Sequence, residues 1–334
     1  MALHVDAAAQ WQRVDVGTIN ELLDIYFFDA NRGFIVGYNS TLLATIDGGQ
    51  TWTNKAVPVP AHLGRIEFVD SDYGWISSSA GIFRTTDGGS TWTMANASLG
   101  GSISFVDRNK GWAASGSYLN SSGWIKHTTD GGVTWVSQAS GLPMDILQLD
   151  FFDQNTGCAV GSWGKILWTN DGGQTWSESP SPIGSYIYGL QVISTTMAFA
   201  AAEGGRIIRT TDAGTTWQVM KSGTGAHVLA ISMSSAEKGV VVGSGGIIRR
   251  TTNGGSSWID NALPSGVTSM YDCTQYCYFR DVFALNDRYS EQCDVSTPLV
   301  MMALQGAFSY YYYHVEYDTA KADCCVAGND CFQY

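Results

Sequence analysis

Two sets of polar residues in this chain have types and spacings that could do chemistry. Each member of one set is followed by two small residues, Gly-Gly or Ala-Gly, which predicts a tight turn: Asp47, Asp87, Asp130, Asp171, Asp212 and Asn253. Acids in such turns could hold a metal ion or present a catalytic proton. The other set, Asp24, Glu67 and Asp150, occupies polar positions in alternating apolar segments. Carboxylates that face one another from such segments could form a general acid–base pair.

The residues around the turn set favour a structural role. A short acid in a tight turn accepts backbone N–H groups, and glycine supplies the positive φ that the turn needs. Asn253 stands in place of the acid in the sixth turn, and Asn170 precedes the acid of the fourth. Asn253 can make the same turn without charge, whereas a metal site would lose a carboxylate. We therefore predict six structural turns and no metal.

These turns belong to an internal repeat that sets the architecture. Each ends in a tryptophan, and successive tryptophans are 40, 43, 41, 41 and 41 residues apart: Trp52, Trp92, Trp135, Trp176, Trp217 and Trp258. A period near 41 with short alternating segments is typical of a four-stranded propeller blade. The sequence predicts an all-β fold, a β-propeller of four-stranded antiparallel blades.

Two columns of apolar residues indicate where the blades pack. First strands carry alternating pairs such as Ile66 and Phe68, and second strands carry one large or apolar residue each: Phe34, Trp75, Trp112, Cys158, Phe199 and Val240. Period-two alternation repeated six times is a strong strand signal. Cys158 is therefore predicted to be a buried free thiol.

Composition excludes several functional classes. Charged residues are only 14% of the chain, which also holds 39 glycines, so a helical protein with charged helix faces is disfavoured. The net charge of −12 counts against nucleic acid and against an anionic membrane surface. No segment reaches the ~20 apolar residues of a transmembrane helix. The first residues, MALHVDAAAQW, are not a recognisable signal peptide, so we expect a cytosolic protein or a form without its targeting segment.

The last part of the chain differs from the repeats. We divide the chain into a propeller, 1–264, and a cysteine-rich tail, 265–334. The tail has an even number of cysteines: Cys273, Cys277, Cys293, Cys324, Cys325 and Cys331. We predict disulfides among them, of undetermined pairing, and hence an oxidising compartment. A zinc site is the alternative, but only Cys273 and Cys277 have the spacing of a knuckle.

The position of Trp11 raises the question of how the ring closes. Trp11 lies 41 residues before Trp52, one full period, with no acidic turn ahead of it. It therefore resembles the outer strand of a blade whose other strands come from elsewhere. We predict seven blades, with inner strands of the seventh from tail segments such as 277–285 and 299–304. The alternative is six blades and a separate cysteine-rich appendage.

The turn motif, S/T-x-D-x-G-x-T-W, is the Asp box, and the chain resembles the BNR/Asp-box propeller family. Its fuller repeat, I-x-F-x-D-x-x-x-G-W-x-x-G followed by I-x-x-T-x-D-G-G-x-T-W, is most similar to the photosystem II stability and assembly factor family. The resemblance covers residues 11–262. It implies a propeller of the thylakoid lumen that binds other proteins. Sialidases, xyloglucanases and sortilin-type receptors also carry the box, so it specifies the fold more than the function.

Signals of catalysis are sparse. A sialidase needs an arginine cluster and an early F/Y-R-I-P motif, yet neither Arg65-Ile66 nor Arg206-Ile207 is followed by proline. No nucleophile elbow, zinc-protease motif or phosphate loop occurs. We therefore predict that the protein is not an enzyme and needs no cofactor.

Two groups of side chains are candidates for binding. Because first strands line the channel of a propeller, Asp24, Arg65, Glu67 and Asp150 are predicted to face it, with ordinary hydrated lining as the alternative. Arginines concentrate positive charge in blades five and six: Arg206, Arg209, Arg249 and Arg250. The assembly-factor family is noted for an arginine patch, which the resemblance does not assign to numbered residues here.

Three hypotheses of function follow. The first is a non-enzymatic propeller that binds protein, as the assembly factors do. The second is a secreted or surface propeller that binds a protein or a glycan. The third is a glycosidase related to sialidases. The compartment is expected to be the extracellular space or the thylakoid lumen.

Overall fold

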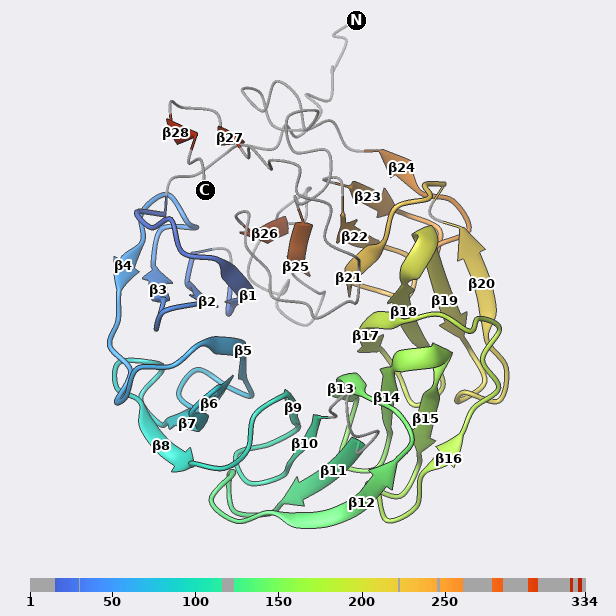
Figure 1. Cartoon of the computed structure of the whole chain (residues 1–334), viewed down its shortest axis with the longest axis horizontal. Helices are drawn as coiled ribbons and strands as arrows, with labels where there is room; N and C mark the ends of the chain where they lie inside the picture. Colours follow the sequence, from blue (N-terminus) through green and yellow to red (C-terminus); the bar gives the residue numbers. More distant parts are fainter. Residues whose placement is uncertain are drawn as a thin grey trace, which may run out of the picture.

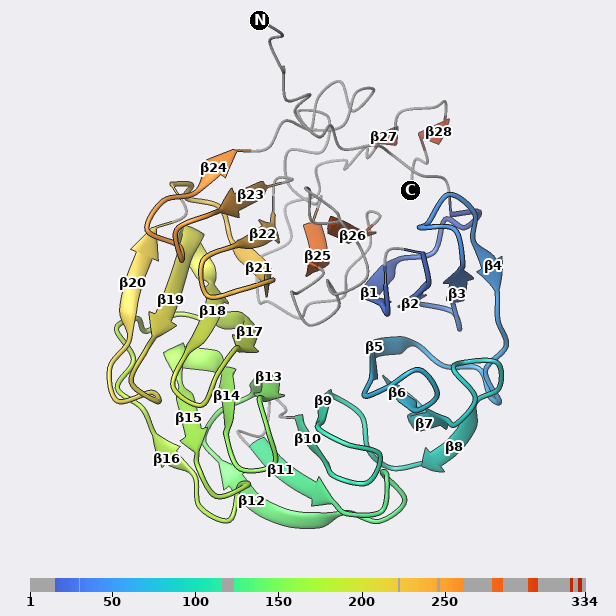
Figure 2. The same ribbon diagram turned by 180° about the vertical axis from the view of Figure 1, so that it is seen from behind.

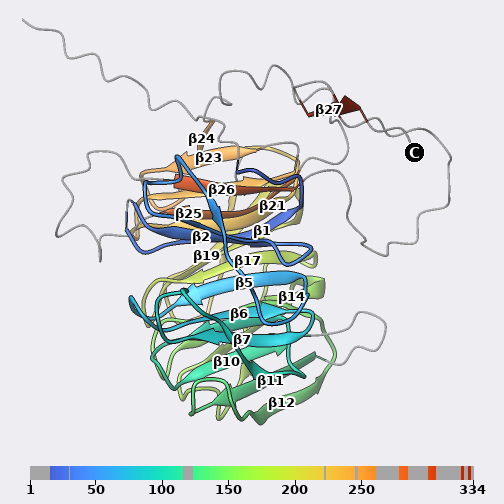
Figure 3. The same ribbon diagram turned by 90° about the vertical axis from the view of Figure 1, so that its left-hand side faces the viewer.

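A computed structural model describes residues 16–29, 31–115, 123–221, 223–244, 247–260, 278–284, 300–305, 325–326 and 330–331. Six four-stranded antiparallel sheets are arranged around a central axis like the blades of a propeller (Figure 1). Seen from the side, the ring is a disc, and the strands run across its thickness (Figure 3). The predicted fold class and blade type are confirmed.

Each blade is a simple meander whose strands follow one another from the axis outward. The first three blades are formed by β1 (Leu22–Phe27), β2 (Gly33–Gly37), β3 (Leu42–Thr45), β4 (Thr53–Asn54); β5 (Leu63–Phe68), β6 (Gly74–Ser78), β7 (Gly81–Thr85), β8 (Thr93–Asn96); and β9 (Ser102–Phe105), β10 (Gly111–Ser115), β11 (Gly123–Thr128), β12 (Val136–Leu142). In a meander, the turn between the first and second strands and the turn between the third and fourth strands lie on one face of the ring. The turn between the second and third strands and the links between blades lie on the other face.

The other three blades repeat this order. They are formed by β13 (Ile146–Phe151), β14 (Gly157–Gly161), β15 (Ile166–Thr169), β16 (Ser177–Glu178); β17 (Ile187–Val192), β18 (Ala198–Ala202), β19 (Arg206–Thr210), β20 (Gln218–Lys221); and β21 (Val228–Met233), β22 (Gly239–Gly243), β23 (Ile248–Thr251), β24 (Ile259–Asp260). Short 3-10 turns, η1 (Ser162–Gly164) and η2 (Glu203–Gly205), join the second and third strands of blades four and five.

The core lies between neighbouring blades. The predicted second-strand residues, Cys158 among them, are all buried. Trp75 of blade two stacks on Phe105 of blade three, with ring centroids 3.7 Å apart, and Trp112 stacks on Phe151 of blade four at 3.6 Å. Such buried aromatic pairs contribute about 1 kcal/mol each beyond the area that they bury. The prediction that first- and second-strand side chains pack blade against blade is confirmed.

The glycine that ends each D-x-x-x-G turn has a packing reason. A Cβ atom at Gly74 would lie 2.4 Å from the ring of Phe68, and one at Gly111 would lie 2.3 Å from the ring of Phe105. In blades one to four, the aromatic ring of the first strand therefore covers the start of the second strand. Any larger residue at the turn would displace that ring from the core.

The seven-blade prediction is not supported, because the structure has six four-stranded blades. The tail segments predicted as inner strands form a two-stranded sheet, β25 (Tyr278–Ala284) with β26 (Val300–Gln305). No third or fourth strand joins this sheet within the described residues, and the repeat that supplies those strands elsewhere is absent from the tail. The predicted outer strand at Trp11 lies outside the described residues.

The two-stranded sheet lies between the first and last blades. β25 contacts β21 and β22 on one side and β1 on the other, and β26 also contacts β1. Figures 1 and 2 show the pair in this gap from both faces of the ring. A second small pair, β27 (Cys325–Val326) with β28 (Asp330–Cys331), is also present. The described chain contains no helix long and apolar enough to span a bilayer.

Candidate functional site

The Asp boxes close on themselves through side-chain hydrogen bonds. In the first, Asp47 Oδ1 accepts from the Thr45 hydroxyl at 2.8 Å and from the Thr51 N–H at 2.9 Å, while Oδ2 accepts from the Thr51 hydroxyl at 2.6 Å. Gly49, at φ +84°, donates its N–H to the Thr45 hydroxyl. Both carboxylate oxygens are therefore engaged within the turn. The same pattern recurs at Asp87, Asp130, Asp171 and Asp212.

The sixth box makes the same turn with an amide. Asn253 Oδ1 accepts from the Thr251 hydroxyl at 3.0 Å and from the Ser257 N–H at 2.9 Å. Its Nδ2 donates to the Ser257 hydroxyl at 2.8 Å, where the other boxes have a hydroxyl that donates to the carboxylate. The turn therefore needs acceptor geometry rather than negative charge. Among the side chains that the structure describes, no three His, Cys, Asp or Glu residues are grouped to hold a metal ion.

The channel-facing carboxylates connect each blade to the next one. Asp24 Oδ2 accepts from the backbone N–H of Ile66 at 2.7 Å, and Asp150 Oδ2 accepts from that of Val192 at 2.6 Å. The first strand is the edge of its sheet that lies at the axis, so the N–H groups on the side away from the second strand have no strand partner. The side chain of the preceding blade satisfies them. We call these contacts inter-blade latches.

Uncharged side chains make the same latches elsewhere in the ring. The Ser104 hydroxyl accepts from the Phe151 N–H at 3.0 Å, and Gln191 Oε1 accepts from the Met233 N–H at 2.5 Å. Tyr26 instead donates its hydroxyl to the Phe68 carbonyl. Alternation predicts that Tyr26 and Gln191 face the channel, but it does not show which backbone atom each side chain reaches.

Arg65 links the latches across the channel. Its Nη2 donates to Gln148 Oε1 of blade four at 2.9 Å, reaching past blade three, which has Ser102 and Ser104 at its channel positions. Its Nη1 lies 4.0 Å from Asp24 Oδ1 of blade one. Gln148 in turn donates to the Leu190 carbonyl of blade five. The structure therefore brings Asp24, Arg65 and Gln148 into one network.

Two of the carboxyl groups have raised pKa values. Desolvation by burial, and then the charge of Asp150, raise the pKa of Glu67 to about 8. Burial raises that of Asp150 to about 6, against the opposing effects of the Val192 N–H and Arg65. Glu67 Oε1 is enclosed and has no hydrogen-bond partner in the described residues. Raised pKa values mark catalytic acids but also buried structural ones, and Asp150 is held by a latch.

The predicted arginines of blades five and six lie on β19 and β23. Arg206 begins β19 and is exposed, with Nη1 3.5 Å from the Ser185 hydroxyl. Arg209 is half-buried and donates to the Gly254 carbonyl of the next blade at 2.9 Å. Arg249 is half-buried in β23, and Arg250 beside it is exposed. Arg65 lies in β5 of blade two.

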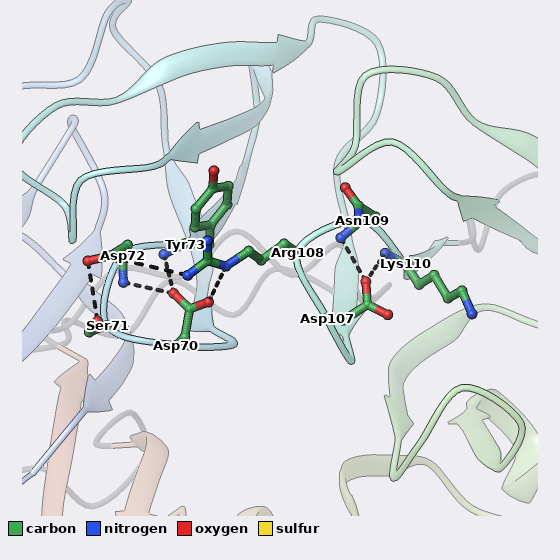
Figure 4. Close-up of polar contacts among 8 residues, drawn as sticks. All are labelled: Asp70, Ser71, Asp72, Tyr73, Asp107, Arg108, Asn109 and Lys110. Atoms are coloured by element: carbon green, nitrogen blue, oxygen red, sulfur yellow. Dashed lines mark hydrogen bonds and ion pairs between the residues drawn. The ribbon is translucent and has the colours of Figure 1, made fainter.

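An ion-pair cluster that the sequence did not indicate joins the first turns of blades two and three (Figure 4). Arg108 Nε lies 2.6 Å from Asp70 Oδ2, and its guanidinium covers the ring of Tyr73, 4.2 Å from the ring centroid. Asp70 Oδ1 also accepts the N–H groups of Asp72 and Tyr73. Exposed pairs of this kind contribute little to stability. They join two blades rather than form a pocket.

Cys158 is fully buried and free, as predicted. Burial raises the pKa of its thiol well above the usual value, so it remains a protonated, unreactive group. The six tail cysteines lie outside the residues whose side chains the structure describes. Their predicted disulfides stay a prediction.

Comparison with known proteins gives consistent results. The sequence profile described as photosynthesis system II assembly factor YCF48 matches residues 3–142 and 138–258. The photosystem II assembly lipoprotein Ycf48 of Synechococcus sp. (strain CC9902) is 34% identical over 92 residues, 26% of this chain and 27% of that protein. The chloroplastic photosystem II stability/assembly factor HCF136 of Arabidopsis thaliana is 35% identical over 97 residues, 25% of this chain and 23% of that one. These alignments thus span about a quarter of each curated relative.

A solved structure titled YCF48 bound to D1 peptide has a TM-score of 0.66 with 19% identity. The similarity covers 87% of this chain and 93% of that one. At this sequence identity, the similarity shows the fold alone. The sequence relatives named here are assembly factors rather than enzymes.

Proposed function

Because the chain belongs to the photosynthesis system II assembly factor YCF48 family, we propose that it is a non-enzymatic propeller that binds a segment of another protein. Family membership carries this proposal, since the matched regions include every strand of the six blades except the last one, β24. The similar solved propeller is named as bound to D1 peptide. We therefore take a D1-like segment as the first candidate partner.

The use of the channel side chains supports a scaffold rather than an enzyme. Asp24 and Asp150 each hold a backbone N–H of the next blade, and Arg65 is shared between two blades. A nucleophile or general base needs a free oxygen within reach of substrate. Glu67 Oε1 has no partner among the described residues, but it is buried. We assign Asp24, Arg65, Glu67 and Asp150 to the internal structure of the ring, and the six Asp-box residues to their turns.

We assign partner binding to the exposed arginines of blades five and six. Arg206 and Arg250 are exposed, and Arg250 makes no hydrogen bond or ion pair to the described residues. In blades two and five, the equivalent arginines, Arg84 and Arg209, donate to carbonyls of the next Asp box. The described residues that follow blade six include no Asp box, and we propose that Arg250 instead donates to an acidic or carbonyl-rich partner.

The tail hairpin has the strand register of a blade. In five of the six blades, the first pair of strands shifts register after its first residue, as between Leu63 and Arg65. The pairing of β25 with β26 shifts between Phe279 and Asp281, where the first strand again advances by two residues and the second strand by one. We propose that this pair, which lies between β1 and β21, bridges the first and last blades as the two inner strands of a blade do.

We also propose an oxidising compartment, the thylakoid lumen. The six tail cysteines favour it by composition. A lipoprotein in a cyanobacterium and a chloroplastic protein in a plant are among the relatives. No observation among the described residues favours glycan binding over protein binding.

Fluorescence anisotropy with labelled peptides that tile the D1 protein tests the proposal. We expect one or more peptides to bind the full chain, and Arg250→Glu to weaken binding by at least about tenfold. Lys55→Glu, at an exposed lysine that follows the outer strand of blade one, is the matched charge control and should bind normally. Failure of every D1 peptide to bind would remove D1 as the partner. Turnover of sialoside or β-glucan substrates that Asp24→Asn abolishes would overturn the non-enzymatic assignment.

A further inference from the structure

A row of aromatic rings crosses blades four, five and six. It lies on the face of the ring that carries the turns between the second and third strands of each blade. Trp163 from η1 lies 5.9 Å from Tyr186, Tyr186 lies 6.1 Å from Tyr188, and Tyr188 lies 6.2 Å from His227, all between ring centroids. Trp163 is 58% exposed and the other three are half-buried. We call these four side chains the aromatic row.

The backbone of Trp163 indicates that its side chain is there for contact. Trp163 has φ +58° and ψ +26°, and the equivalent residue of blade five, Gly204, has φ +68° and ψ +33°. Blade one has Asn39 at this place, with φ +53°. Glycine and asparagine accept this left-handed region readily, whereas a bulky side chain costs about 1 kcal/mol there. An exposed tryptophan offsets little of that cost by burial.

Two cations lie beside the row. Arg206 and Lys221 are directly opposite each other on β19 and β20, and both are exposed. Like charges placed directly opposite destabilise a sheet. Arg206 Nη1 lies 3.5 Å from the hydroxyl of Ser185, the residue before Tyr186, and 3.4 Å from the Glu203 carbonyl. The pair therefore adjoins the row, and Glu203 is the acid of the same turn.

We infer that the aromatic row and the Arg206–Lys221 pair bind an extended acidic peptide segment with apolar side chains at alternate positions. Rings spaced about 6 Å apart approximate the ~6.6 Å repeat of side chains on one face of an extended strand. The paired cations provide charge complementarity to an acidic segment, which a neutral glycan would not need. This inference rests on the proposed scaffold function and specifies the chemistry of its partner.

The test uses the full chain and two labelled probe peptides, one alternating leucine with glutamate and one alternating leucine with lysine. We expect the glutamate probe to bind, and Trp163→Gly to weaken its binding by at least about tenfold. The double variant Arg206→Glu/Lys221→Glu should reverse the preference between the probes. Ile46→Ala, at a residue 82% exposed in the first Asp box, and Lys55→Glu are the matched controls and should change nothing.

Thermal unfolding separates folding from binding, because Trp163→Gly should melt at or slightly above the temperature of the native chain. Equal binding of both probes by the native chain, or unchanged binding by Trp163→Gly, would overturn the inference. Quenching of Trp163 by xyloglucan oligosaccharides, without peptide binding, would do so in favour of a glycan. If D1 peptides bind and only Arg250→Glu weakens them, the proposed function stands and the row is not its site. If the glutamate probe binds by way of the row but no D1 peptide binds, the row is a peptide-binding site and D1 is not its partner.

Discussion

Asp24 of the first blade accepts, through Oδ2, the backbone N–H of Ile66 in the second blade at 2.7 Å. The two residues are 42 positions apart, one repeat of the chain, and Asp150 stands in the same relation to Val192. Both pairs are polar contacts between inner strands that have no backbone pairing with each other. The side chain at this position therefore holds adjacent blades together at the axis, where they are closest.

Removing this latch should destabilise the ring. Asp24→Ala leaves the N–H of the buried residue Ile66 without an acceptor, a loss of about 1–3 kcal/mol. Asp24→Asn keeps an acceptor oxygen and should lose less. Urea unfolding measures both free energies of unfolding. If the alanine and asparagine variants are equally stable, the N–H contact is not what the residue provides.

Glu67 should make stability depend on pH. Its pKa is about 8 in the folded chain and near 4.5 when unfolded, so the folded state holds the proton more tightly. The stability from this group is complete below about pH 4.5 and is lost as pH rises through about 8. Glu67→Gln should therefore match the native chain near pH 4.5 and melt at a higher temperature at pH 8. A mutant advantage that does not vary with pH would contradict the raised pKa.

Asp47 should contribute in the opposite direction. Hydrogen bonds from the Thr51 hydroxyl, the Thr51 N–H and the Thr45 hydroxyl lower its pKa to about 2. Its contribution is present above the unfolded value near 3.8 and is lost as pH falls toward 2. Asp47→Asn should keep most of the stability at pH 7, because Asn253 makes the same turn, and Asp47→Ala should lose more. Addition of Ca²⁺ should leave the melting temperature of all three proteins unchanged, and a calcium-dependent rise would indicate a metal site instead.

The fifth Asp box contains a residue that is strained. Ala213 has φ +56°, where the other five boxes have glycine. Ala213→Gly should relieve up to about 1 kcal/mol of strain, partly offset by the greater entropy of unfolded glycine. Gly172→Ala in the fourth box is the matched reverse change, and its Cβ would lie 2.7 Å from the Gln154 carbonyl. Thermal melts should move in opposite directions. A shift of both variants to lower temperature would show that φ is not limiting at Ala213.

The cysteines can be counted. We expect one free thiol, Cys158, when the chain is unfolded without reductant, because the other six are predicted to form disulfides. Cys325 and Cys331 are opposite each other in the β27–β28 register, the arrangement most readily bridged. Labelling with a thiol reagent before and after reduction gives the count. Five or more free thiols before reduction would disprove the disulfide prediction.

The repeat was readable from the sequence because its physics is local. The Asp box uses hydrogen bonds within a few residues, so equivalents of Asp47 and Thr51 appear together in five copies, and Asn253 and Ser257 replace them in the sixth. The buried columns follow from period-two alternation. The latches were not readable, since the partner of Asp24 lies 42 residues away on another sheet. The aromatic row was missed for a similar reason: Tyr186 and His227 are one repeat of 41 residues apart, but Trp163 belongs to another position of the repeat. The rings meet only when three blades are placed side by side. The one local signal was a tryptophan where sister turns have glycine or asparagine.

Every latch points from one blade to the blade that follows it, and carboxylate, hydroxyl and amide groups all serve as its acceptor. Adjacent blades are thus interchangeable at the contact that holds them. A duplication of about forty residues would insert a blade whose latches fit both of its neighbours. A deletion of the same length would bring together two blades whose latches also fit. The repeats therefore leave the size of the ring open, and the segments at its two ends decide how many units complete the circle.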